Sequence, residues 1–208
     1  MYITKLTPLI LATTVALAGC TIEKSDNVLP NKTPQSNNNP TPPPTNVDNS
    51  QTNNGKVLVS SDGKNQINLP QGWSENKTLN QVANIQAADV SRELYTIVIS
   101  DPKAEVPNLN LQSHSQTTQK NVLNALKNPT VTPTKVNTVN GNPAIQYQIR
   151  GVHAQIGIPV IYLHTTVETP NNFHQIVSWS TPSSFAANEQ ELQNMIQSFK
   201  EVSNSASL

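Results

Sequence analysis

Hydrophobic and polar residues alternate along most of the chain from Lys56 onward, which is the pattern of β-strands with one buried face. The segments that alternate, or that carry a β-branched and apolar run, are 57–59, 67–69, 82–90, 94–99, 131–139, 144–149, 158–167 and 173–181. Turn-forming residues separate several of them, namely Ser61-Asp62-Gly63-Lys64, Asn140-Gly141-Asn142-Pro143 and Pro170-Asn171-Asn172. The pattern therefore predicts a series of hairpins.

Two segments have the spacing of amphipathic helices instead. The first covers 111–127, between Asn110 and Pro129, and its thin stripe consists of Leu111, Ser115, Thr118, Val122 and Leu126. The second is expected to begin with a capping box formed by Asn188 and Glu191, followed by a stripe of Leu192, Met195, Ile196 and Phe199.

The order of these elements predicts an α+β fold, because strands follow strands in hairpins and no βαβ rhythm is present. We expect a twisted antiparallel sheet flanked by helices, formed by residues 56–203, with 204–208 as an unfolded tail. A domain of this size buries enough surface for a core that needs no disulfides.

Residues 21–55 differ from the rest in composition. Prolines, among them Pro42-Pro43-Pro44, stand among Asn, Thr and Ser, and apolar residues are nearly absent after Leu29. Such a segment cannot bury enough surface to fold, so we expect an extended, disordered tether. A proline-motif ligand for a partner protein is the alternative interpretation.

The first residues have the build of a secretory signal. Lys5 precedes an almost uncharged run from Leu6 to Gly19, which is shorter than the ~20 residues of a membrane-spanning helix. We therefore interpret residues 1–19 as a signal peptide. An ordinary signal peptide with a chance cysteine at its end is the alternative.

The end of this run, Leu17-Ala18-Gly19-Cys20, resembles the lipobox of bacterial lipoprotein precursors. The resemblance implies that the chain is cut before Cys20 and that the Cys20 thiol carries lipid. Cys20 is the single cysteine of the chain, so it is not needed for a disulfide. Several acyl chains anchor a protein stably, whereas one binds only marginally. Thr21 is not the aspartate that tends to retain such proteins in the inner membrane, so we expect the outer membrane, facing the periplasm.

Charge excludes several classes of partner. Lys+Arg and Asp+Glu balance at 13 each, and 12% of residues are charged, without a basic run. Nucleic acid is therefore not an expected partner. Seven glycines and the absence of a GxGxxG or GxxxxGK[ST] string argue against phosphate-binding loops.

Three strings in the domain resemble PsbP-like and DcrB-like domains, namely Leu69-Pro70-Gln71-Gly72-Trp73, Asn140-Gly141-Asn142-Pro143-Ala144 and Ile196-Gln197-Ser198-Phe199. The resemblance covers roughly 56–202 and implies an α/β/α sandwich in a mostly non-catalytic family of binding and assembly factors. By their residue types, Gly72 and Gly141 are expected to adopt positive φ, and Trp73 to serve in packing.

The histidines are candidate metal ligands, namely His114, His153, His164 and His174. If Thr169 pairs with Phe173, His174 lies opposite Glu168 and ~13 Å from His164. If Glu168 pairs with Phe173, His164 and His174 point to opposite faces. Neither register gathers enough ligands for a metal site, although a Glu168–His174 pair remains possible in the first.

Hydrolytic chemistry has no clear signal either. Ser113, His114 and Ser115 are neighbours that splay apart on a helix, and no GxSxG string is present. We expect no catalytic residue, no cofactor and no metal. The sequence indicates a lipid-anchored, non-catalytic envelope module that binds a protein partner or assists assembly; a small-ligand or metal carrier is the alternative, and a hydrolase is a third.

Overall fold

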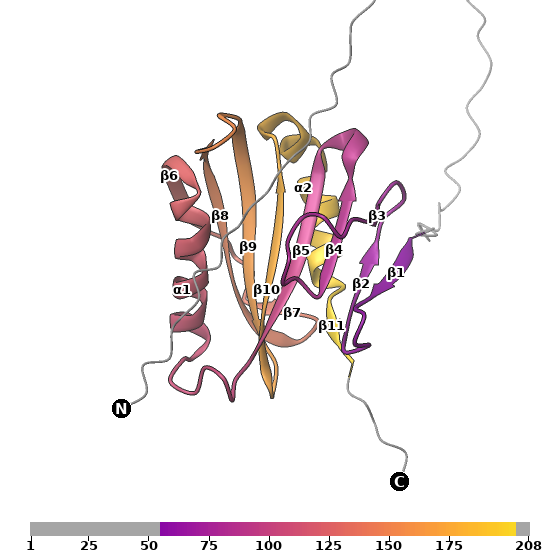
Figure 1. Cartoon of the computed structure of the whole chain (residues 1–208), viewed down its shortest axis with the longest axis vertical. Coiled ribbons are helices and arrows are strands. Elements are labelled where there is room, and N and C mark those ends of the chain that lie inside the picture. The colour runs from indigo at the N-terminus through magenta and orange to yellow at the C-terminus, as the bar shows by residue number, and fades with distance from the viewer. Residues whose placement is uncertain (1–54, 203–208) are drawn as a thin grey trace, which may run out of the picture. The chain divides into compact units, whose positions relative to one another are not determined.

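The computed structural model describes residues 55–202 (Figure 1). The predicted signal peptide, Cys20, the tether and the C-terminal tail lie outside the described residues. Within the described part, no helix is both long and apolar enough to span a membrane.

The main sheet has eight strands, and every pairing in it is antiparallel. Its strands run in the order β3 (Ser74–Glu75), β4 (Ile85–Asp89), β5 (Leu94–Pro102), β10 (Asn172–Ser180), β9 (Pro159–Glu168), β8 (Asn142–His153) and β6 (Leu126–Pro133), while β7 (Thr138–Val139) also pairs with β8. A smaller sheet contains β1 (Lys56–Val59), β2 (Asn65–Leu69) and β11 (Lys200–Glu201). The predicted α+β architecture is confirmed.

The two helices, α1 (Leu111–Asn124) and α2 (Pro182–Gln197), pack on opposite faces of the main sheet (Figure 1). Alternation along the central strands divides their side chains between these faces. On β9, Ile161 and Leu163 join the core that contains α2, whereas Tyr162 joins the core that contains α1. Since both faces are covered, strands β9 and β10 are buried along almost their whole length.

The two cores differ in size. The core under α2 includes Ile67, Leu69, Trp73, Leu94, Ile176, Phe185, Leu192, Ile196 and Phe199. The core under α1 is smaller and gathers Ile97, Ile149, Tyr162, Val177 and Trp179 around Val122 and Leu126. Trp73 is therefore a packing residue, as the sequence predicts.

Helix α1 begins at the predicted residue but ends earlier than expected. The Asn110 side chain accepts a hydrogen bond from the Ser113 N–H, and the Ser113 hydroxyl accepts one from the Asn110 N–H, both at 2.9 Å. The prediction that the helix reaches residue 127 is wrong, because β6 starts at Leu126. Pro129 does not end the helix but lies within β6, beside a register shift and next to Asn128 with φ 49°.

Helix α2 begins six residues before the predicted capping box. Thr181 precedes it and Pro182 occupies the first turn, where proline's missing N–H costs nothing. Asn188 lies inside the helix, and its amide donates to the Ser184 carbonyl at 2.8 Å. The buried Phe185 continues the stripe of Leu192 toward the N-terminus, a helical spacing that the prediction missed.

Several strand boundaries also differ. The predicted strand 82–90 narrows to β4, and its ends Val82 and Val90 are exposed. The predicted strand 131–139 divides into the end of β6 and β7. Strand β8 is longer than 144–149, and the short strands β3 and β11 were not predicted.

A charged network joins α2 to the turn before β3. Arg92, at the end of the short 3-10 helix Val90–Arg92, contacts Asp89 at 2.7 Å and both carboxylate oxygens of Glu191 at 2.8 and 3.0 Å. The Trp73 indole N–H donates to Glu191 at 2.8 Å. Burial opposes the ionisation of Asp89, but hydrogen bonds from Ser91 and Arg92 outweigh it and lower the pKa of Asp89.

The turn that presents Trp73 depends on Gly72. Its φ is +92°, and a Cβ there would lie 2.5 Å from Asp89 Oδ2. Gly157 offers a matched control, with φ +71° and no atom within 4 Å of an added Cβ. Both substitutions by alanine strain the backbone, but only Gly72→Ala also displaces Asp89 from Arg92.

We therefore expect Gly72→Ala to lower the free energy of unfolding by about 1–3 kcal/mol more than Gly157→Ala. Urea unfolding monitored by tryptophan fluorescence measures both losses. Equal losses for the two variants would show that the Asp89–Arg92 contact contributes nothing at this turn.

Candidate functional site

The histidines lie on two faces of the sheet. Phe173 pairs with Glu168, so of the two registers considered above the second is correct, and His164 and His174 point to opposite faces. His114, His164 and His174 are 2%, 0% and 0% exposed. His153 lies at the end of β8 and pairs with Leu126 of β6.

Helix α1 and the sheet bring His114 and Asp101 together. The Asn110 cap fixes the first turn of α1 and places His114 over β5 and β10. Its Nε2 donates to Asp101 Oδ2 at 2.9 Å, since a carboxylate only accepts, and the Gln175 amide donates to the same oxygen at 2.7 Å. The His114 ring stacks on Phe173 with 4.7 Å between centroids.

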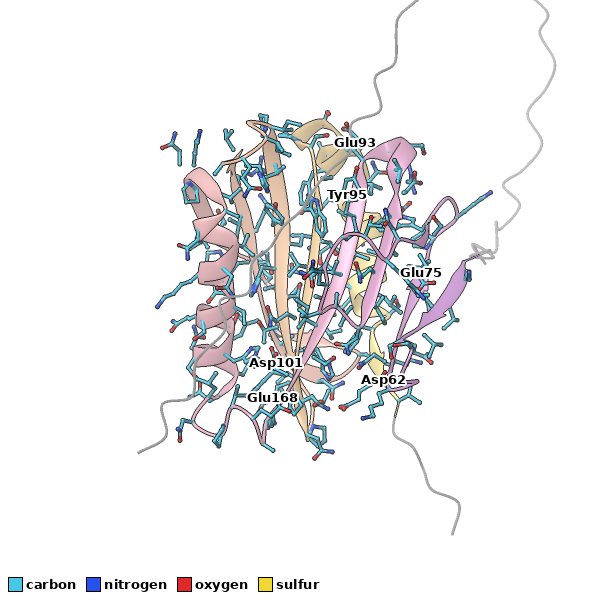
Figure 2. The ribbon with its side chains drawn as sticks, in the orientation of Figure 1. Asp62, Glu75, Glu93, Tyr95, Asp101 and Glu168 are labelled. Atoms are coloured by element: carbon cyan, nitrogen blue, oxygen red, sulfur yellow. The ribbon has the colours of Figure 1, made fainter. Side chains whose placement is uncertain are left out.

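Asp101 is consequently held as a carboxylate. Burial opposes its ionisation, but the hydrogen bonds from His114 and Gln175 outweigh burial and lower the pKa of Asp101. Figure 2 shows Asp101 and Glu168 at one end of the sheet and Glu93 and Tyr95 at the opposite end. Asp101, the hydrogen-bond partner of His114, thus lies at the end of the sheet away from Glu93 and Tyr95.

His164 lies deeper beneath the same helix. The Thr118 hydroxyl donates to the backbone carbonyls of His114 and Ser115 at 3.1 and 3.2 Å, and so it accepts from His164 Nε2 at 3.1 Å. Burial, assisted by the charge of His114, lowers the pKa of His164 to about 4. His164 is therefore neutral near pH 7.

The interface around these two histidines contains buried polar atoms without a hydrogen-bond partner among the described residues. They are Nδ1 of His114, Nδ1 of His164, Oγ of Ser115, Nε2 of Gln119 and Oγ1 of Thr166. Each such atom costs free energy when it is desolvated. The N-terminal half of α1 thus rests on a polar and incompletely paired surface, whereas its other half packs through Val122 and Leu123. We call residues 101, 114, 118, 164 and 175 the histidine cluster.

His174 has a separate environment on the α2 face. Its ring nitrogens bond to the Ser100 and Thr169 hydroxyls at 2.9 and 3.2 Å, and Nε2 lies 3.7 Å from Glu201. Burial lowers the pKa of His174, although Glu201 opposes this effect. The Glu168–His174 pair considered from the sequence does not form, because Glu168 lies on the other face and binds Lys103 at 2.8 Å.

This geometry favours a structural role for the histidine cluster over catalysis. His114 and His164 have almost no contact with solvent, and Ser113 uses its hydroxyl in the helix cap rather than beside His114. Within residues 55–202, no three His, Cys, Asp or Glu side chains gather as a metal site would require.

One shallow pocket lies beside the loop between β3 and β4. Its volume is about 130 Å³, and it is lined by Ser61, Glu75, Lys77, Ala83, Asn84 and Gln86. Small-molecule sites usually span ~300–1,000 Å³. This pocket has room for a few water molecules, and the exposed Glu75–Lys77 ion pair at 3.3 Å already satisfies its charges.

Solved structures with a similar fold are known. One of them is Saccharomyces cerevisiae Mog1p, described as a Ran-binding protein, which is 16% identical in sequence. The superposition covers 73% of this chain and 97% of the Mog1p chain, with a TM-score of 0.53. This chain shares the Mog1 fold. A point mutant of Mog1 gives a TM-score of 0.52 at 15% identity, with coverage of 73% and 98%.

The PsbP protein of Synechocystis sp. PCC 6803 is 10% identical over 74% of this chain and 96% of its own, with a TM-score of 0.49. No protein-family model matches the sequence, and no curated protein is similar to it at the sequence level. At these identities the similarity concerns the fold.

Sequence reasoning missed the approach of His114 to Asp101 and His164. The two elements that carry His114 and Asp101 are separated by the loop 103–110, whose path is not encoded by periodicity. A partial signal was present, because Asn110 introduces the predicted helix and His114 falls one turn later on its buried face.

The low pKa of His164 predicts a dependence of stability on pH. Between the ordinary value of 6.5 and about 4, the unfolded chain binds a proton that the folded chain does not. Stability therefore decreases as pH falls through this window, by about 3 kcal/mol for His164 at its lower end. Protonation of Asp101 affects stability at lower pH than this window, below the ordinary carboxylate pKa of 3.8.

The change that tests this expectation is His164→Gln, which keeps a hydrogen-bonding side chain beside Thr118 but cannot titrate. Urea unfolding at successive pH values should give a shallower slope for the variant than for the wild type. The slope is the readout, so a constant loss of stability in the variant does not matter. Parallel slopes would contradict a buried neutral His164.

Proposed function

We propose that this chain is a lipid-anchored, non-catalytic lipoprotein of the bacterial cell envelope that binds a protein partner or assists the assembly of an envelope complex. The contrast between its interior and its surface carries the proposal. His114 and His164 are buried under α1, whereas the hydrophobic side chains of Val57 and Val59 are exposed on β1. Surface recognition therefore fits this domain better than chemistry on a bound substrate.

The fold comparison is consistent with this role. Mog1p, which has the same fold, is a Ran-binding protein. The similarity supports a domain of this architecture acting through its surface.

The N-terminal sequence supplies the proposed mechanism of attachment. Lipid on Cys20 would fix the chain to the outer membrane, facing the periplasm, and the proline-rich residues 21–55 would act as a tether. At ~3.1 Å per residue an extended tether reaches on the order of 100 Å, and a coil-like one about 30 Å. The tether would thus let the domain search a layer above the membrane while its anchor stays fixed.

In-cell crosslinking followed by affinity purification tests the proposal. We expect the wild-type chain to carry the mass of a diacylglyceryl group on Cys20 and to enrich one or two envelope proteins. Cys20→Ala removes the lipid and should abolish the enrichment, because a dilute soluble domain loses the effective concentration that anchoring provides.

Thr21→Asp is the matched control, since it keeps the lipid but favours retention in the inner membrane. Loss of partners in both variants indicates that the partner lies at the outer membrane, whereas loss in Cys20→Ala alone indicates that anchoring is sufficient. Equal enrichment by wild type and Cys20→Ala would contradict the role of the anchor.

A further inference from the structure

Strand β1 presents an open edge. Among the described strands, β1 is hydrogen-bonded only to β2, and its other side faces solvent. Open edges invite pairing with another chain unless proline, charge or a bulge protects them. The edge strand β6 is protected by Pro129, by Pro133 and by the bulge between Lys127 and Thr130. The edge strand β3 is only two residues long, which is too short to pair with another chain. Strand β1 has neither proline nor bulge in Lys56–Val59, and its one charged residue, Lys56, stands at the first position of the strand.

The free hydrogen-bonding groups of this edge belong to two valines. The Ser60 N–H donates to the Asn65 carbonyl at 2.8 Å, which makes Ser60 and Asn65 a hydrogen-bonded pair. Such pairs alternate along an antiparallel ladder, so Leu58 also bonds inward, to Ile67, whereas the N–H and C=O groups of Val57 and Val59 point outward.

The side chains of the same two residues are exposed. Leu58 is 7% exposed and belongs to the core, while Val57 is 50% exposed and Val59 is 47% exposed. Alternation places both valines on the outer face of the small sheet. The edge therefore offers unpaired backbone groups and an apolar strip at the same positions.

We propose that β1 pairs in antiparallel fashion with β1 of a second copy of this chain. A twofold axis through Leu58 sets Val57 of one copy opposite Val59 of the other. Each such pair exchanges two N–H···O=C bonds, so the twofold axis creates four bonds, and all of them use groups that are free in the single domain. The four valines then form one cluster on the outer face.

Charge favours this symmetric register. Lys56 lies opposite Ser60 of the second copy, so the two lysines are at opposite ends of the joined strands and do not face each other. Asp62 follows two residues after Ser60, in the turn, and a diagonal neighbour at that position is within reach of a lysine side chain. Asp62 is charged, because hydrogen bonds from Ser60 and Lys64 lower its pKa. Each end of the joined strands thus places Asp62 of one copy, which already lies near Lys64 of its own turn, within reach of Lys56 of the other copy.

The strand pair is short, so self-association in solution is weak. Interfaces of this size lie at the low end of the range for specific complexes. Anchoring on a membrane would raise the effective concentration and favour the pair. The pairing itself does not depend on lipid, and it can be tested without the anchor.

Amide exchange resolves the proposal residue by residue. On a chain of residues 21–208, NMR-detected hydrogen exchange is followed from micromolar to millimolar concentration. We expect the Val57 and Val59 amides to become severalfold slower with concentration, while the Leu58 amide is slow throughout. Rates for Val57 and Val59 that do not change with concentration overturn the proposal.

Charge-swapped variants provide the second test. Val57→Lys/Val59→Lys and Val57→Glu/Val59→Glu each place like charges opposite one another and should be monomeric in sedimentation velocity. An equimolar mixture places opposite charges across the same pairs and should form mixed dimers. A mixture that stays monomeric contradicts the proposed register.

Two further variants distinguish pairing at the β1 edge from nonspecific self-association. Val59→Pro removes an N–H that is free in the single domain, so it should leave the fold intact and abolish self-association. Val131→Lys on the exposed part of β6 should leave self-association unchanged. The contrary result is a wild-type chain that is monomeric at all concentrations and that loses its crosslinked envelope partner in the Val59→Pro variant. That result would show that the edge pairs with a strand of another protein. The second-copy proposal would then be wrong, while the proposed function would stand.

Discussion

The pairing of Glu168 with Phe173 is the constraint on which the arrangement of this domain depends. The β9–β10 hairpin lies at the centre of the sheet, and both strands are covered on both faces, so its register decides which side chains meet α1 and which meet α2. A slip of one residue would turn one of the two strands over relative to the other. If β9 turned, His164 would enter the larger apolar core; if β10 turned instead, Ile176 would face the polar half of α1.

The two sides of the sheet consequently hold their helices in different ways. Helix α2 is fixed by an apolar core and by Glu191, which binds Arg92 and Trp73. Helix α1 has apolar contacts near its C-terminal end and a polar, partly unpaired interface near its N-terminal end. Protonation of His164 would place a charge in that interface, which makes α1 sensitive to acid.

The sequence predicted much of the fold because alternation and turn residues are local signals. The hairpin at Pro170–Asn172, the cap at Asn110 and the positive φ of Gly72 and Gly141 all follow from such signals. The start of α2 was missed because no large apolar residue lies between Phe185 and Leu192, and the end of α1 was missed because Leu126 fits both a helix and a strand. The contact between Asp101 and His114 depends on packing across the sheet, which local patterns do not specify.

A domain whose histidines are buried, and whose apolar side chains appear at a strand edge beside a proposed tether, is suited to recognition at its surface. The rings of His114 and His164 are closed to solvent beneath α1. An NMR titration of the histidine rings in the native chain tests this closure. We expect a pKa of about 4 for His164 and a pKa below 6.5 for His174. Ordinary titration of His164 near 6.5 would show that α1 opens and that the cluster is an accessible site.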